Sequence, residues 1–274
     1  MELSELLASE AALPSIPKVV VLLVSETNRP EPDLRHISQL LGTDPALTMR
    51  TLQMANSSLL PMPGKISSVS EALAILGLNH LRSLAAAATR GSAVRAIPGI
   101  NLQQFWRYSL NVAKLSRSFA GKVKQNSATA FTAGLIHAMG ELVMHSVMPE
   151  KMAAIGETTA PFDLRRAKIE HRALGYCFAE VSAGLARQWQ FPGTLVDALQ
   201  HQYTPFDNDA YEPLAGVLHL AGWRARAKEA GLTDRELAVS FPGEVGLTMG
   251  LDIDMVLQQH PIDWTSGNEA GEYI

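Results

Sequence analysis

The chain has 274 residues, of which 47% are hydrophobic and 18% charged, and this composition excludes a disordered protein. Its formal net charge of −4 leaves no excess of lysine and arginine, which argues against a protein that holds nucleic-acid backbones by bulk electrostatics. The single cysteine, Cys177, excludes intramolecular disulfides and cysteine-based zinc fingers and is typical of a reducing compartment.

The N-terminal segment lacks the pattern of an export signal. It carries Glu2, Glu5 and Glu10, whereas a signal peptide begins with a basic region followed by an apolar core. Apolar runs such as Leu84 to Ala88 are far shorter than the roughly 20 residues that cross a bilayer. We therefore expect a cytoplasmic protein without membrane contact.

Helical periodicity dominates the chain. Almost every segment between glycine and proline residues has a helical period, and no two alternating runs are joined by a hairpin signal. The sequence therefore predicts an all-α protein. In the first third, helix starts are expected at Pro17, after Asp33, at Asp44 with Pro45, and at a capping box of Ser68 and Glu71. An alanine-rich helix from Leu78 to about Val94 follows.

A seam is predicted where Pro98 and Gly99 interrupt helical continuity. The helices expected beyond it are Phe105–Ala120, Ala128–Val147, Asp163–Leu174, Phe178–Trp189, Thr194–Gln202, Tyr211–Ala230 and Asp252–His260. The segment 128–147 is apolar on nearly all sides, which indicates the centre of a bundle. The predicted organisation is an N-terminal lobe over 1–94, a helical bundle over 95–210, additional helices over 211–260 and a flexible tail over 261–274.

Signatures of serine hydrolases, phosphate-binding loops and dinucleotide-binding folds are absent from the sequence. The histidine that most needs an explanation is His137, on the helix predicted to be most buried, with Glu141 one turn further along. One interpretation is a metal ligand with a carboxylate neighbour. The other is a neutral core histidine whose ring nitrogens bond locally, and it is favoured because buried histidines are more often structural.

Successive blocks of the sequence resemble the HDOD family, a relative of the HD-domain metal-dependent phosphohydrolases. These blocks are LPSIPKVV, LLGTDPALTMRTLQMANSSLLPMPGKISSVSEALAILGLNHLRSLAAA, FWRYSLNVAKLSRSFA, FTAGLIHAMGELVM and HRALGYCFAEVSAGLARQWQFPGTLVDALQHQY. They run in order from Leu13 to about Tyr203. The resemblance implies a two-lobed all-α protein in which the second lobe is an HD-like helical bundle.

The resemblance also implies that the metal centre of the HD enzymes is lost. Their His-Asp doublet corresponds to His137 followed by Ala138. The other ligand positions fall at Tyr108 or Ser109, Phe178 and Gly222, while His201 is retained and His219 lies nearby. A hydrolytic metal centre needs three or four ligands and an open position for water. We therefore expect no catalytic residues, no metal and no other cofactor.

The resemblance implies a non-catalytic bacterial module of signal transduction or regulation. It is expected to bind a signalling protein or a small ligand such as a nucleotide. His137, Glu141 and His201 are the candidate walls of the degenerate pocket. Possible anion partners, by charge type, are Arg82, Arg107 and Arg165.

Two alternatives remain open. The first is a metal-dependent phosphohydrolase of HD type with a non-standard metal site. The second is a DNA-binding regulator that uses the helix-turn-helix-like segment 37–55, with Thr48, Arg50, Thr51 and Gln53 as groove contacts. Asp44 at the start of its second helix would repel phosphate, so a purely structural helical hairpin is favoured and nucleic acid is not an expected partner.

Overall fold

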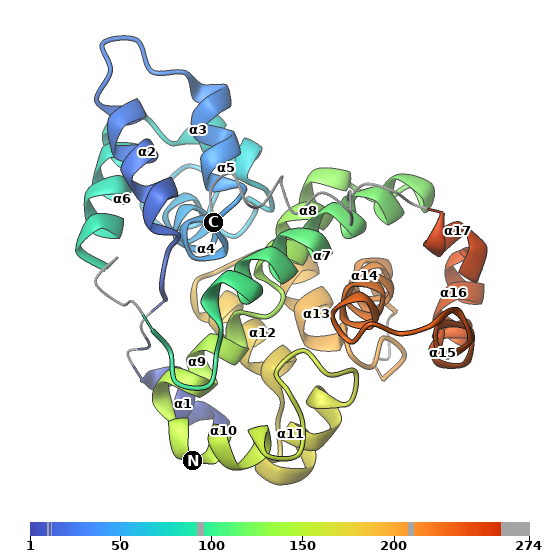
Figure 1. Cartoon of the computed structure of the whole chain (residues 1–274). Coiled ribbons are helices and arrows are strands. Elements are labelled where there is room, and N and C mark those ends of the chain that lie inside the picture. Colours follow the sequence, from blue (N-terminus) through green and yellow to red (C-terminus); the bar gives the residue numbers. More distant parts are fainter. Residues whose placement is uncertain (10, 12, 92–95, 208–210, 259–274) are drawn as a thin grey trace.

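The computed structural model describes residues 1–9, 11, 13–91, 96–207 and 211–258, and within these ranges the chain is helical and contains no strand (Figure 1). The all-α prediction is therefore confirmed. Arg95, a basic residue of the predicted seam, and the predicted tail 261–274 lie outside the described residues. No described helix is long and apolar enough to span a membrane.

Five helices form the N-terminal lobe: α2 (Pro17–Thr27), α3 (Leu34–Leu41), α4 (Pro45–Ala55), α5 (Val69–Ile75) and α6 (Leu78–Gly91). The predicted start signals act as expected, since Asp33, Asp44 and Ser68 accept hydrogen bonds from backbone N–H groups of the first turns. The capping box is only half formed. The Glu71 carboxylate accepts from the N–H of Ser67 instead of Ser68, which moves the reciprocal bond outside the helix.

Asp44 does more than cap its own helix. One carboxylate oxygen accepts from the N–H of Leu47, at 2.9 Å, inside α4. The other accepts from the N–H of Ile16, at 2.6 Å, in the segment that leads into α2. The Asp44 side chain is fully buried, and it therefore ties two helix starts together inside the lobe.

The second helix of the helix-turn-helix-like segment, α4, faces the core of its lobe. Thr48 and Thr51 of α4 are fully buried, and the Arg50 guanidinium donates to the Leu13 carbonyl at 3.1 Å. Of the four predicted groove contacts, Gln53 alone is exposed. These contacts agree with the favoured interpretation of segment 37–55 as a structural helical hairpin, and DNA binding stays an untested alternative.

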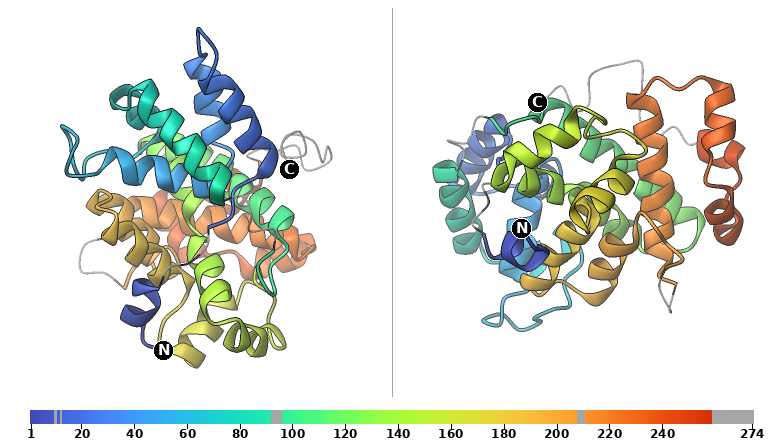
Figure 2. Two further views of the ribbon diagram at one scale, coloured as in Figure 1. Left: turned by 90° about the vertical axis from the view of Figure 1, so that its left-hand side faces the viewer. Right: turned by 90° about the horizontal axis from the view of Figure 1, so that it is seen from below.

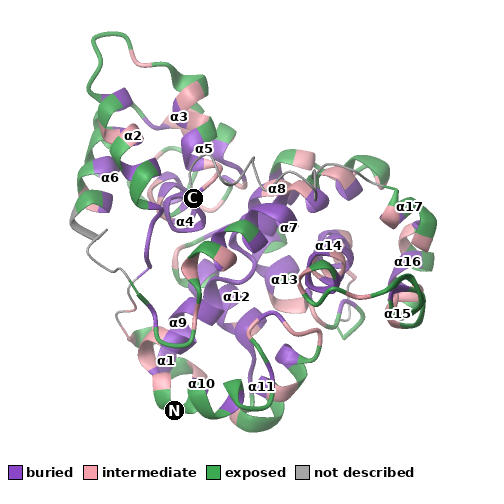
Figure 3. Cartoon of the chain, in the orientation of Figure 1, coloured by how far each residue is buried: buried purple, intermediate pink, exposed green. Residues whose placement is uncertain are grey.

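The bundle is built from α7 (Leu102–Lys122), α8 (Ser127–Ile136), α9 (Met139–Val147), α12 (Phe178–Gln188), α13 (Gly193–His201) and α14 (Pro213–Glu229). Figure 3 shows the buried residues concentrated on α7, α9 and α12. Close helix contacts require glycine here, since a Cβ at Gly140 on α9 would collide with the Phe178 carbonyl of α12.

Six shorter helices complete the fold: α1 (Leu3–Ala8), α10 (Pro149–Gly156), α11 (Arg166–Leu174), α15 (Asp234–Ser240), α16 (Gly243–Met249) and α17 (Ile253–Leu257). Helix α1 packs against α9 and α12 of the bundle although it opens the chain. Helices α15–α17 lie on the side of the bundle away from α2–α6 (Figures 1 and 2). The boundaries proposed at 94, 210 and 260 remain predictions.

The predicted continuous helix 128–147 is wrong, because the chain breaks between α8 and α9 at His137 and Ala138. The His137 carbonyl leaves the helical ladder and accepts from the Ser182 hydroxyl at 2.9 Å and from the Gln202 amide at 3.0 Å. Two side chains from α12 and the end of α13 therefore stabilise the break, which directs α9 away from the axis of α8.

The two aspartate caps provide a test of the lobe. We expect Asp44→Ala to lower the free energy of unfolding by about 2–4 kcal/mol, because it removes a cap and leaves the buried N–H of Ile16 without an acceptor. Asp33→Ala removes an exposed cap and should cost about 1 kcal/mol or less. Urea denaturation of both variants measures the difference, and equal losses would contradict the role assigned to Asp44.

Candidate functional site

A cavity of about 380 Å³ opens where α7, α12 and α14 meet the break between α8 and α9. Tyr108, His137, Phe178 and Gly222 all line it. These are the positions at which the resemblance places the lost metal ligands and the retained histidine of the HD doublet. Residues more than 110 positions apart in the sequence therefore converge on one cavity, at the place that the resemblance implies.

Both ring nitrogens of His137 are engaged in hydrogen bonds. Nδ1 lies 2.7 Å from the Gly134 carbonyl, which can only accept, so Nδ1 carries the proton. Nε2 is then the acceptor for the Tyr108 hydroxyl, at 3.0 Å. Burial, aided by the nearby Arg226 guanidinium, lowers the pKa of His137 to about 3, so the ring is neutral near pH 7. His137 is thus the locally bonded core histidine of the second interpretation.

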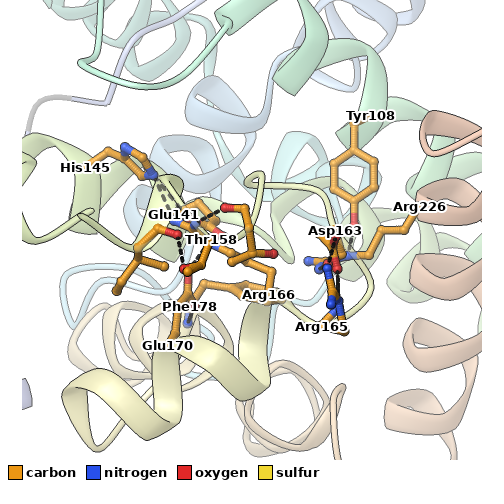
Figure 4. A network of polar contacts seen from close by, with 12 residues as sticks. Tyr108, Glu141, His145, Thr158, Asp163, Arg165, Arg166, Glu170, Phe178 and Arg226 are labelled. Atoms are coloured by element: carbon orange, nitrogen blue, oxygen red, sulfur yellow. Dashed lines mark hydrogen bonds and ion pairs between the residues drawn. The ribbon is translucent and has the colours of Figure 1, made fainter. Parts of the chain in front are cut away.

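Arg226 of α14 continues this chain of hydrogen bonds (Figure 4). Its Nε donates to the Tyr108 oxygen at 2.9 Å, and Nη1 donates to the Asp163 carbonyl at 2.7 Å. The guanidinium carbon lies 4.9 Å from the centre of the Phe178 ring. Arg226 thus donates to Tyr108, Tyr108 donates to His137, and His137 donates to the Gly134 carbonyl. This continuous set of hydrogen bonds forms a fixed polar wall of the cavity.

The residues around this cavity do not fit the divalent metal of the HD enzymes. The lone pair of His137 is used by Tyr108, and the neighbouring position, Ala138, has no carboxylate. A guanidinium in the same wall repels a cation. Within the described part of the chain, no three histidine, cysteine, aspartate or glutamate side chains gather as ligands.

Glu141 does not line the cavity but lies in a second buried network (Figure 4). The fully buried Arg166 donates from Nε to Glu141 at 3.2 Å and to Glu170 at 2.6 Å. It also donates to the Thr159 carbonyl at 2.9 Å and to Nε2 of His145 at 3.1 Å. Together, these four contacts fix the position of the Arg166 guanidinium within the bundle.

Charge in this second network is balanced internally. Burial, reinforced by the Glu170 carboxylate, raises the pKa of Glu141 well above its usual value, so the acid form of Glu141 is favoured. Burial lowers the pKa of His145 to about 4, and the contact of 3.6 Å between His145 and Glu141 is therefore not an ion pair at neutral pH. One guanidinium and one carboxylate remain, which is an electrically neutral arrangement.

The third candidate, His201, lines a different pocket of about 580 Å³ together with Lys168, His171 and Cys177. The expectation that His137, Glu141 and His201 share one wall is thus corrected. The chain breaks between α8 and α9 at His137, Glu141 lies in the buried network around Arg166, and His201 lines the neighbouring pocket, which shares Tyr203 with the cavity. Whether any of the three contacts a ligand stays a prediction.

The three predicted anion partners also separate. Arg165 lines the cavity, where its guanidinium bonds both oxygens of Asp163 at 3.1 and 3.2 Å. Arg82 donates to the Thr27 carbonyl at 2.9 Å, between α6 and α2. Arg107 contacts Glu229 at 3.4 Å and is largely exposed. The cation that sequence reasoning missed is Arg226, which lies in the run RARAK and has no local signal that separates it from exposed neighbours.

Comparisons with known proteins place the chain among related sequences. The model of the HDOD domain matches residues 13–205. A protein of Treponema pallidum (strain Nichols), described only as uncharacterized, is 23% identical over 217 residues, which cover 78% of this chain. That match covers 42% of the Treponema protein, so this chain spans less than half of the relative's length.

Solved structures share the fold. A fragment of the MmoQ response regulator of Methylococcus capsulatus (Bath) gives a TM-score of 0.70 at 24% identity, covering 89% of this chain and 94% of that one. A candidate phosphohydrolase of Shewanella amazonensis SB2B gives a TM-score of 0.51 at 28% identity, covering 91% of each chain. Both likenesses extend over both lobes of the chain, because each covers nearly all of it.

The neutral state of His137 has a consequence for acid stability. Its pKa in the folded protein, about 3, lies below the ordinary value of 6.5. The neutral ring therefore contributes to the free energy of unfolding above pH 6.5, and this contribution is lost as the pH falls toward 3. We expect His137→Gln to flatten the fall in unfolding free energy between about pH 6.5 and 4 by up to about 1.4 kcal/mol per pH unit. Denaturant titrations at several pH values measure this slope. The exposed His80→Gln is the control, and equal slopes in both variants would contradict the assignment.

The second network predicts unequal effects of its members. Arg166→Met leaves a buried carboxylate without its cation and should cost about 3–5 kcal/mol of unfolding free energy. Glu141→Gln replaces a side chain already favoured as neutral, so it should cost less than about 1 kcal/mol at neutral pH.

The pH dependence of the same pair checks this interpretation. The raised pKa of Glu141 stabilises the fold at low pH, and this contribution is lost as the pH rises through the folded value. The stability of Glu141→Gln relative to the wild type should therefore increase with pH. A relative stability that decreases with pH would show that Glu141 is ionised in the fold.

Proposed function

We propose, from the premise that the chain belongs to the HDOD family, that it is a non-catalytic bacterial signalling module that acts by binding. The ligand is a small molecule, and its site is the cavity at the former metal centre. A signalling protein then recognises the liganded or the free module. The cytoplasmic location expected from the sequence is part of the same proposal.

The observation that carries this proposal is that the positions where the resemblance places the lost metal ligands line a cavity, whose polar wall is the hydrogen-bonded set of His137, Tyr108 and Arg226. Tyr108, Phe178 and Gly222 occupy the ligand positions, and they surround a cavity that persists at about 380 Å³. A site of this volume with a few convergent polar groups suits a small ligand. The cavity is thus retained while the donors for a hydrolytic ion are not, which favours binding over turnover.

Phosphodiester hydrolysis is the alternative that the Shewanella relative's description raises. A hydrolytic ion needs several ligands and an open position for its water. His137 offers no free lone pair, and Arg226 supplies a positive charge beside the place where the ion would lie. These features count against the hydrolase reading, although the fold is shared.

A turnover assay and a thermal-shift screen test the proposal together. We expect no metal-dependent hydrolysis of bis(p-nitrophenyl) phosphate with Mn²⁺, Fe²⁺, Ni²⁺ or Zn²⁺ above the level of a His137→Ala variant. We expect at least one compound in a panel of nucleotides and small acids to raise the melting temperature, since a ligand at 100 times its Kd adds about 2.7 kcal/mol of stability.

The hydrolase alternative would give the opposite pattern. Stoichiometric metal in the purified protein, with turnover that His137→Ala abolishes, would overturn the non-catalytic proposal. His80→Gln serves as the matched control, because it changes an exposed histidine of α6 far from the cavity.

A further inference from the structure

Arg226 is a buried cation without an anionic partner. Its side chain is 7% exposed and lines the cavity. Its hydrogen bonds go to the neutral Tyr108 hydroxyl and to the Asp163 main-chain carbonyl. Over the part of the chain that the structure describes, no carboxylate lies within ion-pair distance of this guanidinium.

Arg166 provides the comparison within the same bundle. It is fully buried, and it contacts the carboxyl groups of both Glu141 and Glu170. A guanidinium remains protonated in proteins, and a buried charge is stable only when polar groups or a counter-charge compensate it. The fold meets this requirement with carboxyl groups at Arg166, whereas at Arg226 the direct contacts are with neutral acceptors and aromatic rings.

Burial acts to lower the pKa of Arg226, and Tyr108 together with the carboxyl groups of Glu141 and Glu170 raises it, but neither carboxyl group is within ion-pair distance of its guanidinium. The Asp163 carboxylate faces away to Arg165, which it bonds through both oxygens. Burial chiefly lowers the pKa of both His137 and His219, so neither ring carries charge near pH 7. None of the described residues that line the cavity is acidic. Two guanidinium groups therefore line the cavity: that of Arg165 is paired with Asp163, whereas that of Arg226 has no carboxylate in direct contact.

Several of the side chains that line the cavity beside Arg226 are apolar or aromatic. Phe178 packs its ring against the guanidinium, with 4.9 Å between the ring centre and the guanidinium carbon. Trp223 and Leu218 of α14 line the same space. Apolar and aromatic walls of this kind bury the body of a ligand, while a single charged group orients it. The low dielectric of the site strengthens attraction between Arg226 and an anion.

We propose that the cavity binds a small organic anion whose carboxylate or phosphate group pairs with Arg226 and whose ring or apolar body packs against Phe178 and Trp223. This inference rests on the proposed binding function and adds the class of ligand. It assigns the binding role to a residue outside the predicted candidates. Carboxylate and phosphate share the chemistry that a guanidinium recognises, namely two acceptor oxygens in one plane.

Isothermal titration calorimetry on the full chain tests the inference with matched pairs of probes. We expect benzoate or phenyl phosphate to bind saturably in the millimolar range or tighter, whereas the neutral analogues benzamide and phenol bind at least about tenfold more weakly. A preference for phenyl phosphate over benzoate would identify a phosphate ligand, and the reverse preference would identify a carboxylate.

Two arginine variants locate the effect. Arg226→Met should weaken binding of the anionic probe by about 10- to 100-fold, since it removes a hydrogen bond to a charged group. Arg107→Met is the control, because it removes the same side chain from an exposed position of α7, outside the residues that line the cavity. It should bind the probe as the wild type does.

A folding control keeps the test decisive. If circular dichroism shows that Arg226→Met is unfolded, Arg226→Lys takes its place. Lysine retains the charge but lacks the planar pair of donors, so this variant should bind the phenyl phosphate or benzoate probe more weakly than the wild type. The comparison of charged and neutral probes on the wild type needs no variant at all.

The outcomes separate this inference from the proposed function. If benzamide or phenol binds as tightly as its anionic analogue, or if no anion binds at millimolar concentration, the anion site is overturned. A nucleoside or other neutral ligand found by the thermal-shift screen would leave the binding function intact in that case. Metal-dependent turnover would instead overturn the proposed function, whatever the calorimetry shows.

Discussion

Two buried guanidinium groups organise the interior of the bundle. Arg166 joins α11 to Glu141 on α9 and to the Thr159 carbonyl. Arg226 joins α14 to Tyr108 on α7 and to the Asp163 carbonyl. Because an arginine cannot lose its proton inside a protein, each of these groups requires acceptors in fixed places. The segment between α10 and α11 supplies a main-chain carbonyl to both, so the positions of four helices depend on one connecting segment.

The contacts of Asp163 connect the wall of the cavity to an exposed side chain. The Asp163 carbonyl receives Arg226, while the Asp163 carboxylate holds the exposed Arg165. Asp163 thus contacts both a side chain of the cavity wall and an exposed side chain just before α11. On the other side, α14 leads into α15–α17 at the edge of the molecule.

Local sequence signals were sufficient for most helices and insufficient for the site. Asp33, Asp44 and Ser68 mark helix starts because capping depends on a few adjacent residues. The break at His137 depends instead on Ser182 and Gln202, which lie far along the chain, and no local pattern reveals it. Glu141 was misplaced for that reason. Arg226 was missed because burial of an arginine is decided by tertiary packing, whereas the resemblance correctly indicated which residues surround the cavity.

The carbonyl of His137 accepts hydrogen bonds from two side chains. His137 and Ala138 are the positions at which the resemblance places the His-Asp doublet of the HD enzymes. Restoring an aspartate at Ala138 would not by itself restore a hydrolase. The new carboxylate would be buried beside a histidine whose lone pair is used by Tyr108. An aspartate at position 138 would therefore add a buried negative charge to the bundle without completing a set of metal ligands among the described residues.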